Sequence, residues 1–489
     1  MQTTLHQNVK AFLARPLPHY LGGREVPGPT GEVINPSDGS VLAHVSLGGA
    51  KEIDLAVAAA AQAFPAWAAL RPNERAVSLH RLADALERHA TELAQLESLD
   101  VGKPVTAATG FDVPFGIQAL RYFADLAVQA HYRVPLAIQN IEAWTCRMPF
   151  GVCGFIFPWN FPFTLLCWGI APALAAGNTV VVKPSEVTPL TSLRVAQIAA
   201  EAGLPAGVIN VVTGTGPQAG AALAAHPRIK RMSFTGSPAV GRQVGAVCGQ
   251  NLVPCKLELG GKGAAVVFDD ANVPDTAQKL AAAITLNTGQ VCCTATRWMI
   301  HERIYDAFVD AVRAALRQTR IGPGLDTDTQ MGPLVSEVQR RRVLGCLDRG
   351  RSEGATVLLE GGPGDPLGQR GFYVTPALLA GAEDNVCCRE EIFGPCAYLV
   401  KFTDEDTVIR QVNQLAYGLA NSVWSADLDR ANRVAERMVA GNSWINAHNV
   451  FAYGLPYGGV NLSGLGGGVN SPETFNDYLR SQTIARPLT

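Results

Sequence analysis

From Gly151 to Asp270, short runs of apolar and β-branched residues alternate with segments of helical length. Strands without polar alternation are buried on both faces, and helical connections of about 10 to 15 residues join strands that run parallel. The pattern therefore predicts a doubly wound parallel α/β sheet, which binds ligands at the carboxyl ends of its strands. The expected strands are 152-VCGFIF, 179-TVVVK, 208-VINVVT, 232-MSFTG and 264-AAVVFDD, with helices through 164–176 and 190–203, after Gly216 and after Ser237.

The rest of the chain predicts further packed units, because 489 residues are too many for one core. A second α/β unit is indicated by strands near 297-RWMIH, 397-AYLVKF and 420-ANSVW, with Gly-rich joints at 441-GNSWINAHN and 458-GGVNLSGLGGG. Ahead of the first sheet, leucines near a helical period predict one amphipathic surface helix: Leu79, Leu82, Leu86, Leu93 and Leu96. The β-prone end, 478-YLRSQTIARPLT, is expected to pair outside the second unit.

Composition excludes several classes of function. The 40 Lys and Arg balance 42 Asp and Glu without a basic stripe, so nucleic acid is not an expected partner. Eleven cysteines form an odd set without framework spacing, and the N-terminal residues lack the apolar core of a secretory signal, which favours a reduced, cytoplasmic protein. The nine histidines show no paired ligand spacing and no CxxC occurs, so no metal is expected.

The uncharged segment 148–182 is long enough to span a bilayer. However, Pro158, Pro162 and Pro172 within it would leave backbone groups unsatisfied in lipid. A buried strand, loop and helix is the better interpretation, and no membrane contact is expected.

Four motifs could carry chemistry, and each alone is weak evidence. The stretch 287-NTGQVCCTATR contains adjacent Cys292 and Cys293, but a buried thiol is usually a small apolar residue. Glu258 in 257-LELGGKG is more often a structural partner than a base, and Asn160 in 157-FPWNFP is more often a turn residue. The turn 236-GSPAVG follows a strand and opens a helix, as phosphate sites do, but it is not a GxGxxG fingerprint.

Taken together and in order, FPWNFP, KPSE, FTGSPAVG, LELGGK, GQVC, EEIFGP and PYGG, with 97-ESLDVGKP-104 near the start, resemble the NAD(P)-dependent aldehyde dehydrogenase superfamily. The resemblance covers nearly the whole chain. It implies an NAD-binding domain of residues 1–131 and 150–257 and a catalytic domain of residues 258–460. It also implies a small β oligomerisation arm of residues 132–149 and 470–489, which pairs across a homodimer or a dimer of dimers.

The same resemblance assigns the catalytic roles. It implies that Cys292 is the nucleophile, that Asn160 and the Cys292 backbone N–H hold the oxyanion, and that Glu258 is the general base. A thiolate attacks an aldehyde carbonyl readily and, after hydride transfer to NAD, leaves a thioester that water can cleave. The expected activity is irreversible oxidation of an aldehyde to a carboxylic acid. Nothing in the sequence indicates what would lower the pKa of Cys292.

The resemblance also implies a dinucleotide site made of Trp159, Lys183, Glu186, Gly216, Pro217, Ser237, Val240, Glu391 and Phe393. A carboxylate at Glu186 accepts hydrogen bonds from ribose hydroxyls but repels a 2′-phosphate. NAD is therefore the expected cofactor. Lys183 softens the repulsion, so NADP is expected as a poorer substitute.

By register with the family, the substrate channel is expected to be lined by Phe115, Phe161, Trp168, Cys293, Phe451 and Tyr457, with His448 nearby. Aromatic walls favour aromatic or medium-chain apolar aldehydes. No Lys or Arg occurs among these positions, which disfavours semialdehydes of diacids. Because aromatic boxes also hold cations, a betaine aldehyde or amino-aldehyde is the alternative, with Asp112 assisting.

Three rival classes stay open. A hydrolase could use the same thiol, a structural protein could use the same fold, and a CoA-acylating enzyme could pass the thioester to CoA. The dinucleotide motifs disfavour a hydrolase. The joint presence of Cys292, Asn160 and Glu258 disfavours a structural protein, and Glu258 alone disfavours a CoA-acylating enzyme. The chain also departs from the family at 463-SGLGGG-468, where an Arg-Glu pair is usual.

Overall fold

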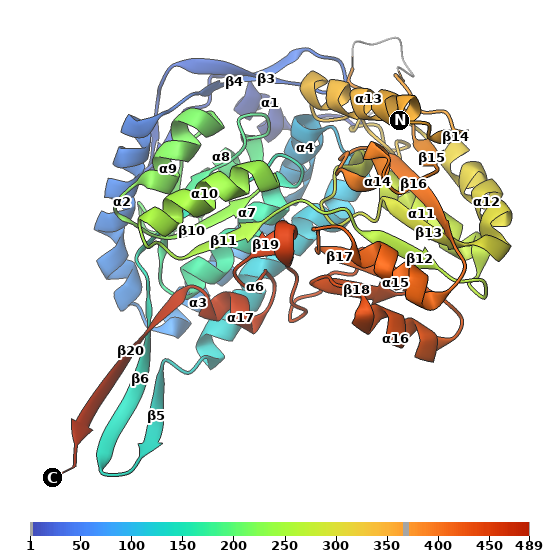
Figure 1. Cartoon of the computed structure of the whole chain (residues 1–489). Helices are drawn as coiled ribbons and strands as arrows, with labels where there is room; N and C mark the ends of the chain where they lie inside the picture. The colour runs from blue at the N-terminus through green and yellow to red at the C-terminus, as the bar shows by residue number, and fades with distance from the viewer. Residues whose placement is uncertain (1–2, 365–370, 489) are drawn as a thin grey trace.

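The computed structural model describes residues 3–364 and 371–488. Residues 1, 2, 365–370 and 489, which fall within the predicted domain ranges, lie outside it. Two α/β units lie side by side, and a narrow arm of three strands extends from the first unit (Figure 1). The α/β fold class predicted from the sequence is confirmed.

The first sheet has eight strands with a parallel centre in the order β11-β10-β7-β8-β9. These strands are β7 (Val152–Ile156), β8 (Thr179–Lys183), β9 (Ile209–Val211), β10 (Ile229–Thr235) and β11 (Cys255–Glu258). At one edge the sheet is extended by antiparallel β1 (His19–Leu21) and β2 (Arg24–Val26), and at the other by β19 (Gly464–Leu465). The strands predicted between Val152 and Gly236 are confirmed.

Helices cover both faces of this sheet, as a doubly wound fold requires. One face is covered by α3 (Pro72–Arg88), α6 (Val113–Gln129), α7 (Pro162–Ala175) and α8 (Leu190–Glu201). The other is covered by α2 (Ala50–Ala69), α9 (Ala221–Ala225), which continues η2 (Gly216–Gly220), and α10 (Pro238–Gln250).

The second sheet has the strand order β14-β15-β16-β13-β12-β17-β18. Its strands are β12 (Ala264–Val267), β13 (Arg297–His301), β14 (Thr356–Leu359), β15 (Ala377–Ala380), β16 (Cys396–Phe402), β17 (Ala420–Trp424) and β18 (Asn442–Ile445). One face packs against α11 (Val273–Thr285) and α12 (Tyr305–Arg317), the other against α13 (Glu337–Ser352), α15 (Glu405–Asn413) and α16 (Leu428–Arg437).

Two sequence predictions in this region were wrong. The strand at 264–270 was assigned to the first sheet, but β12 pairs with β13 and β17 of the second. Only residues 259–263 separate β11 from β12, and a parallel neighbour in the same sheet needs a crossover of about a dozen residues. The stretch 441–449, predicted as a joint, contains β18, which completes the sheet.

The single helix predicted from Leu79 to Leu96 is two helices, α3 and α4 (Ala90–Val101), separated at His89. The second is not a surface helix, because every residue from Glu92 to Val101 is buried. The acidic side chains of α4 led us to predict a solvent-exposed face. In the structure they are buried, and Glu92 and Glu97 are paired with basic side chains. Glu92 accepts a hydrogen bond from Arg194, and Glu97 lies 3.1 Å from the Lys103 amine.

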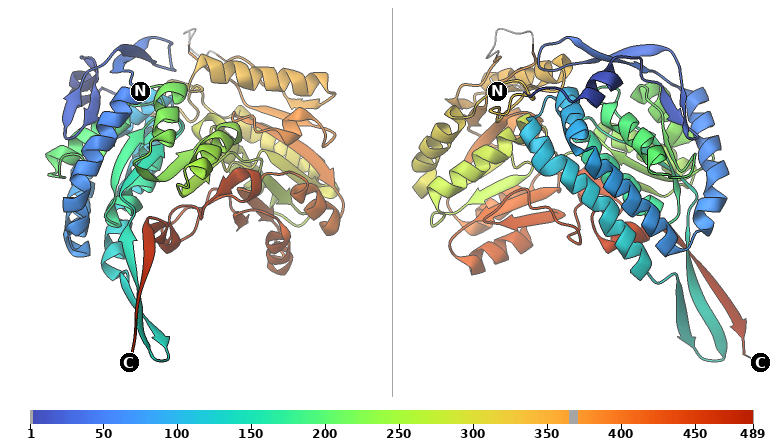
Figure 2. Two further views of the ribbon diagram at one scale, coloured as in Figure 1. Left: turned by 60° about the vertical axis from the view of Figure 1, so that its left-hand side comes forward. Right: turned by 180° about the vertical axis from the view of Figure 1, so that it is seen from behind.

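The arm is formed by β5 (Arg133–Ile138), β6 (Ile141–Pro149) and β20 (Leu479–Pro487), all antiparallel. Both views in Figure 2 show it projecting from the body, with the C-terminus at its tip. The prediction that the C-terminal stretch pairs outside the second unit is confirmed. Residues 148–182 contain β7, a loop and α7, as expected, between the end of β6 and most of β8. Within the ranges that the structure describes, no helix combines the length and the apolar character needed to cross a membrane.

The remaining elements are short or peripheral. They are α1 (Gln7–Leu13), β3 (Thr30–Ile34), β4 (Val41–Ser46), α5 (Val105–Ala107), η1 (Ala108–Asp112), η3 (Leu286–Gly289), η4 (Glu302–Ile304), α14 (Val386–Arg389), η5 (Asn461–Ser463) and α17 (Pro472–Asn476).

Candidate active site

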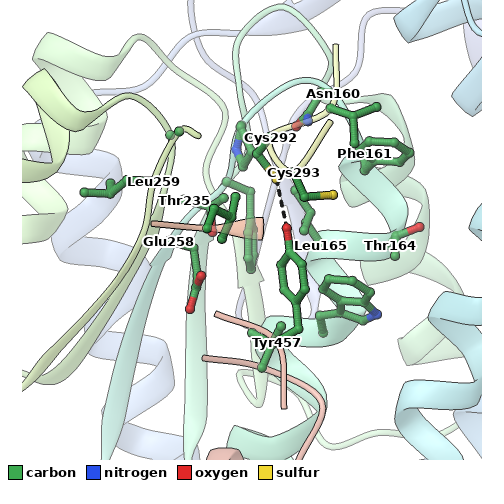
Figure 3. A pocket seen from close by; sticks show the side chains of 18 of the residues that line it. Asn160, Phe161, Thr164, Leu165, Thr235, Glu258, Leu259, Cys292, Cys293 and Tyr457 are labelled. Carbon is green, nitrogen blue, oxygen red and sulfur yellow. Dashed lines mark hydrogen bonds between the residues drawn. The ribbon is translucent and has the colours of Figure 1, made fainter. Parts of the chain in front are cut away.

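A pocket of about 360 Å³ lies where the carboxyl ends of the first sheet face the second unit. It brings together many of the residues singled out in the sequence: Trp159, Asn160, Phe161, Trp168, Ser237, Glu258, Cys292, Cys293, Glu391, Phe393, Phe451 and Tyr457. Figure 3 shows Asn160, Cys292 and Tyr457 converging in it. Phe115, Lys183, Glu186, Gly216, Pro217, Val240 and His448 lie outside its lining.

The loop that carries Cys292 is held in one conformation. Asn287 has a φ of 47°, and Gly289 has a φ of 72°, where an added Cβ would lie 2.1 Å from the Gly394 carbonyl oxygen. The buried Gln290 side chain donates to the Asn287 carbonyl at 2.9 Å and accepts from a backbone N–H of the second unit, also at 2.9 Å. The position of the thiol is therefore set by the backbone of the loop.

The two adjacent thiols have different partners. Cys292 Sγ lies 3.3 Å from the Tyr457 hydroxyl, whereas Cys293 Sγ donates to Asn449 Oδ1 at 3.3 Å. The Cys293 thiol and the Tyr457 hydroxyl lower the pKa of Cys292, and burial opposes them. The Cys292 thiol beside Cys293 raises the pKa of Cys293 well above its ordinary value, and burial adds to this effect. Of these two thiols, Cys292 is the one whose pKa is lowered.

His448 contacts the backbone of this loop and not the pocket. Its Nε2 lies 3.0 Å from both the Ala295 N–H and the Cys293 carbonyl oxygen. Burial lowers the pKa of His448 to about 4, so the ring is neutral and Nε2 can satisfy only one of the two at a time. His448 therefore fastens the residues just after Cys292, a role that the sequence did not suggest.

Asn160 is placed by the turn that begins α7. Its Nδ2 donates to the Gln290 carbonyl at 3.0 Å, and its own carbonyl accepts from Asn287 at 2.9 Å. Nδ2 carries a second N–H that no hydrogen bond among the described residues occupies, and Asn160 lines the same pocket as Cys292. An amide N–H in such a pocket can stabilise an oxyanion.

Glu258 ends β11, and Lys256, two residues earlier, shares its side of the strand. Burial raises the pKa of Glu258 to about 8, although the Lys256 charge opposes the shift. Lys256 is buried as well and donates to the Gly468 carbonyl at 3.0 Å, in the segment that lacks the usual Arg-Glu pair. Lys256 was missed from the sequence, although a lysine inside a strand that leads to Glu258 was a visible signal.

The dinucleotide residues of the first sheet gather along its carboxyl edge. Lys183 ends β8, pairs in register with Ile156 of β7, and lies 2.9 Å from Glu186. Ser237 caps α10 by accepting from the Val240 N–H at 3.4 Å. Exposed apolar side chains of Pro217 and Val240 stand at the starts of η2 and α10. A helix N-terminus for a pyrophosphate and a carboxylate for ribose hydroxyls fit a dinucleotide.

Glu391 and Phe393 complete this site from the second unit. Glu391 accepts from the Gly261 N–H at 2.9 Å, and a Cβ on Gly260 would lie 2.1 Å from its Oε2. Burial raises the pKa of Glu391 to about 7. The Phe393 ring packs edge-on against Trp159 at 5.2 Å. The two glycines of LELGGK thus allow the Glu391 carboxyl group to approach the backbone.

The side of the pocket away from the dinucleotide residues is aromatic. The Phe115 ring lies 5.6 Å from Trp168, and Phe451 lies 5.4 Å from Tyr457. Trp168 Nε1 donates to the Tyr453 hydroxyl at 3.0 Å, and that hydroxyl donates to the Phe115 carbonyl. The indole N–H and the Tyr453 hydroxyl are thus hydrogen-bonded within the protein. The aromatic side of the pocket therefore offers a substrate mainly apolar ring surface. Phe111 also lines it, and both Phe111 and Tyr453 were missed from the sequence, although an aromatic pair at 111 and 115 suits one helix face.

The suggestion that Asp112 assists a cationic substrate was wrong. Asp112 is buried, lies 3.2 Å from the Lys103 amine and does not line the pocket. The same amine also lies 3.1 Å from Glu97. The Asp112 carboxyl group is therefore paired with Lys103 inside the protein. The Lys103 amine also lies 4.1 Å from the centre of the Phe161 ring.

Two further findings concern cysteines and metals. All eleven cysteines lie in the described part of the chain and are free. Among residues 3–364 and 371–488, no three His, Cys, Asp or Glu side chains are grouped so that they could hold a metal ion.

A thiol, an amide and a buried carboxyl group beside the ligand-binding edge of a doubly wound sheet fit a dinucleotide-dependent enzyme that acts on carbonyl compounds. The chain belongs to the aldehyde dehydrogenase family, whose model matches residues 25–484. It is 41% identical to a mitochondrial aldehyde dehydrogenase of Leishmania tarentolae, over 91% of this chain and 90% of the other. It is 40% identical to a phenylacetaldehyde dehydrogenase of Pseudomonas fluorescens, over 95% of each. The NAD⁺ complex of an aldehyde dehydrogenase from Bacillus cereus superposes with a TM-score of 0.97 at 35% identity, covering 100% of both chains. The resemblance seen in the sequence motifs is confirmed.

Proposed function

We propose that the protein oxidises aldehydes irreversibly to carboxylic acids with NAD, through a covalent adduct on Cys292. The observation that carries this proposal is the single pocket in which Cys292, Asn160 and Glu258 meet the dinucleotide edge. Solved structures of relatives in complex with NAD⁺ support the choice of cofactor.

In the proposed reaction, the Cys292 thiolate bonds to the aldehyde carbon, and the carbonyl oxygen becomes an oxyanion held by Asn160 and the Cys292 N–H. NAD, which Glu186, Ser237 and Glu391 would help to hold, would supply the acceptor for the hydride on that carbon. The acyl group remains on sulfur as a thioester. Glu258 then takes a proton from water, the hydroxide oxygen bonds to the acyl carbon, and the carbon–sulfur bond breaks to release the acid and restore the thiolate.

The first prediction concerns the cofactor. The Glu186 carboxylate, held by Lys183 at 2.9 Å, would lie near the adenine-side ribose and repel a 2′-phosphate. We expect kcat/KM with NAD to exceed that with NADP about tenfold or more. Glu186→Gln keeps the shape of the side chain and removes its charge. It should therefore reduce the ratio of kcat/KM with NAD to kcat/KM with NADP. Equal or better use of NADP by the unmodified enzyme would contradict the assignment.

The second prediction concerns the substrate. We propose aromatic or medium-chain apolar aldehydes, because the pocket wall offers the ring faces of Trp168, Phe451 and Tyr457 and their stacking supplies about 0.5–1.5 kcal/mol per contact. Benzaldehyde or phenylacetaldehyde should exceed betaine aldehyde and 4-aminobutyraldehyde about tenfold in kcat/KM. The relative named for phenylacetaldehyde supports this order. A tenfold advantage for either cationic aldehyde would favour the alternative, a betaine or amino-aldehyde dehydrogenase.

We also propose that the arm assembles the chain as a homodimer or a dimer of dimers. In the three-stranded sheet, β20 lies at an edge, and its residues from Arg480 to Pro487 are exposed. A long exposed edge strand is usually covered by another strand or surface. The domain boundaries and the cytoplasmic location stay predictions from the sequence.

A further inference from the structure

We propose that Tyr457 is a catalytic residue, whose hydroxyl donates a hydrogen bond to Cys292 Sγ and holds that sulfur as the thiolate. The inference rests on the proposed function, in which Cys292 is the nucleophile, and it assigns Tyr457 a role beyond its place in the aromatic wall.

The position of the Tyr457 hydroxyl is fixed by its surroundings. Its backbone forms an isolated bridge with Val469, in which the Tyr457 N–H donates at 3.0 Å and its carbonyl accepts at 2.6 Å. The ring packs against Trp168 at 6.0 Å and Phe451 at 5.4 Å. The hydroxyl then lies 3.3 Å from Cys292 Sγ, and Figure 3 shows it pointing at the thiol.

When Cys292 is ionised, the hydrogen bond has one direction, from the Tyr457 hydroxyl to the sulfur. Burial raises the pKa of Tyr457 well above its ordinary value, and the neighbouring Cys292 and Cys293 add to the effect, so the hydroxyl keeps its proton. Cys293, the other neighbour that lowers the pKa of Cys292, has a single S–H, and in this structure its sulfur donates to Asn449 Oδ1 at 3.3 Å. Tyr457 is therefore the donor that can serve Cys292 while Cys293 stays bonded to Asn449.

Besides Tyr457, the groups that lower the pKa of Cys292 are the Cys293 thiol and the Cys292 backbone N–H, and none of them is a cation. Reactive cysteines are usually activated by a cation or a helix N-terminus. His448 beside the loop is neutral, and the Glu391 carboxyl group raises the pKa of Cys292. Among the described residues, no Lys, Arg or His side chain forms a hydrogen bond or an ion pair with the Cys292 sulfur. A neutral hydroxyl donor fits this environment, because it stabilises the anion without adding a buried charge.

The test is the pH dependence of Cys292 alkylation by iodoacetamide, followed by mass spectrometry of the peptide that contains it. Tyr457→Phe keeps the ring and removes only the hydroxyl. It should raise the apparent pKa of Cys292 by about one unit and slow alkylation below that pKa about tenfold. Tyr453→Phe is the matched control, because its hydroxyl contacts Phe115 and Trp168, and it should leave the pKa unchanged.

An unchanged alkylation profile in Tyr457→Phe, or an equal shift in Tyr453→Phe, would overturn the proposal. Cys293→Ala should leave the pKa of Cys292 nearly unchanged. A large rise in that pKa would show that the Cys293 thiol, and not Tyr457, stabilises the Cys292 thiolate. In turnover, the kcat/KM of a folded Tyr457→Phe enzyme should recover as pH rises, which a packing defect would not do. Alkylation needs neither aldehyde nor cofactor, so failure of the proposed function would appear separately, as absence of NADH formation by the unmodified enzyme.

Discussion

Cys292→Ala is expected to lower aldehyde oxidation by about 10⁴-fold or more, whereas Cys293→Ala should keep substantial activity. The two thiols are adjacent in sequence, but only Cys292 combines a lowered pKa with a position beside Asn160. Cys293 is buried, and its S–H is occupied by Asn449 at 3.3 Å. NADH formation, followed by the absorbance of the reduced nicotinamide, measures both variants.

The Cys293 variant is the matched control, because it removes a thiol from the same loop and the same pocket. Loss of activity in Cys293→Ala with retention in Cys292→Ala would reverse the assignment and remove the basis of the proposed mechanism. Equal loss in both would indicate that the loop, held by His448 and Gln290, fails to keep its shape when either side chain is truncated.

Local pattern predicted the centre of the first sheet, because β7, β8, β9 and β10 are mostly buried and each is followed by a helical segment of its own. The pattern could not assign β12 to a sheet, since a run such as Ala264–Val267 is equally suited to either core. The connection from β11 to β12 decides the assignment, because it is too short for the crossover that two parallel strands of one sheet need. The sequence contains this length, but its meaning depends on knowing that the strands are parallel.

The buried acidic residues of α4 were misread for a different reason. Sequence periodicity assigns Glu92 and Glu97 to solvent, because an unpaired buried carboxylate is costly. Their partners, Arg194 and Lys103, occupy positions that periodicity does not connect with α4. Asp112 was misassigned in the same way, because its pairing with Lys103 depends on tertiary packing.

The candidate site was found through its motifs and not through any one residue. Motif order indicated Cys292, Asn160 and Glu258, which line one pocket. The sequence did not show the Tyr457 hydroxyl on Cys292, a contact across 165 positions, and although Lys256 was visible in its strand, its effect on Glu258 was not. Such contacts depend on which atoms of a pocket wall face one another, and a single sequence does not contain that information.

Glu258→Gln is expected to release a burst of NADH close to one per active site and then to stall. The glutamine keeps the shape of the side chain but cannot take a proton from water, so the thioester on Cys292 forms and is not hydrolysed. Intact-mass measurement should find the acyl group retained on the enzyme. Loss of the burst together with turnover would instead indicate a structural role for Glu258. Release of the acyl group by added CoA would favour the CoA-acylating alternative.

The pH dependence of acyl-enzyme hydrolysis tests the same residue in the unmodified enzyme. Burial raises the pKa of Glu258 to about 8, so at lower pH the carboxyl group is mostly protonated and cannot act as a base. Hydrolysis should therefore accelerate as pH rises towards 8 and level off above it. The Lys256 charge favours the carboxylate form of Glu258, so Lys256→Met should raise the pKa of Glu258 further. The rising part of the pH–rate profile, the acidic limb, should then move to higher pH. If that pKa rises by about one, hydrolysis at neutral pH should slow about tenfold. A limb that moves to lower pH in Lys256→Met, or that persists in Glu258→Gln, would show that another group is the base.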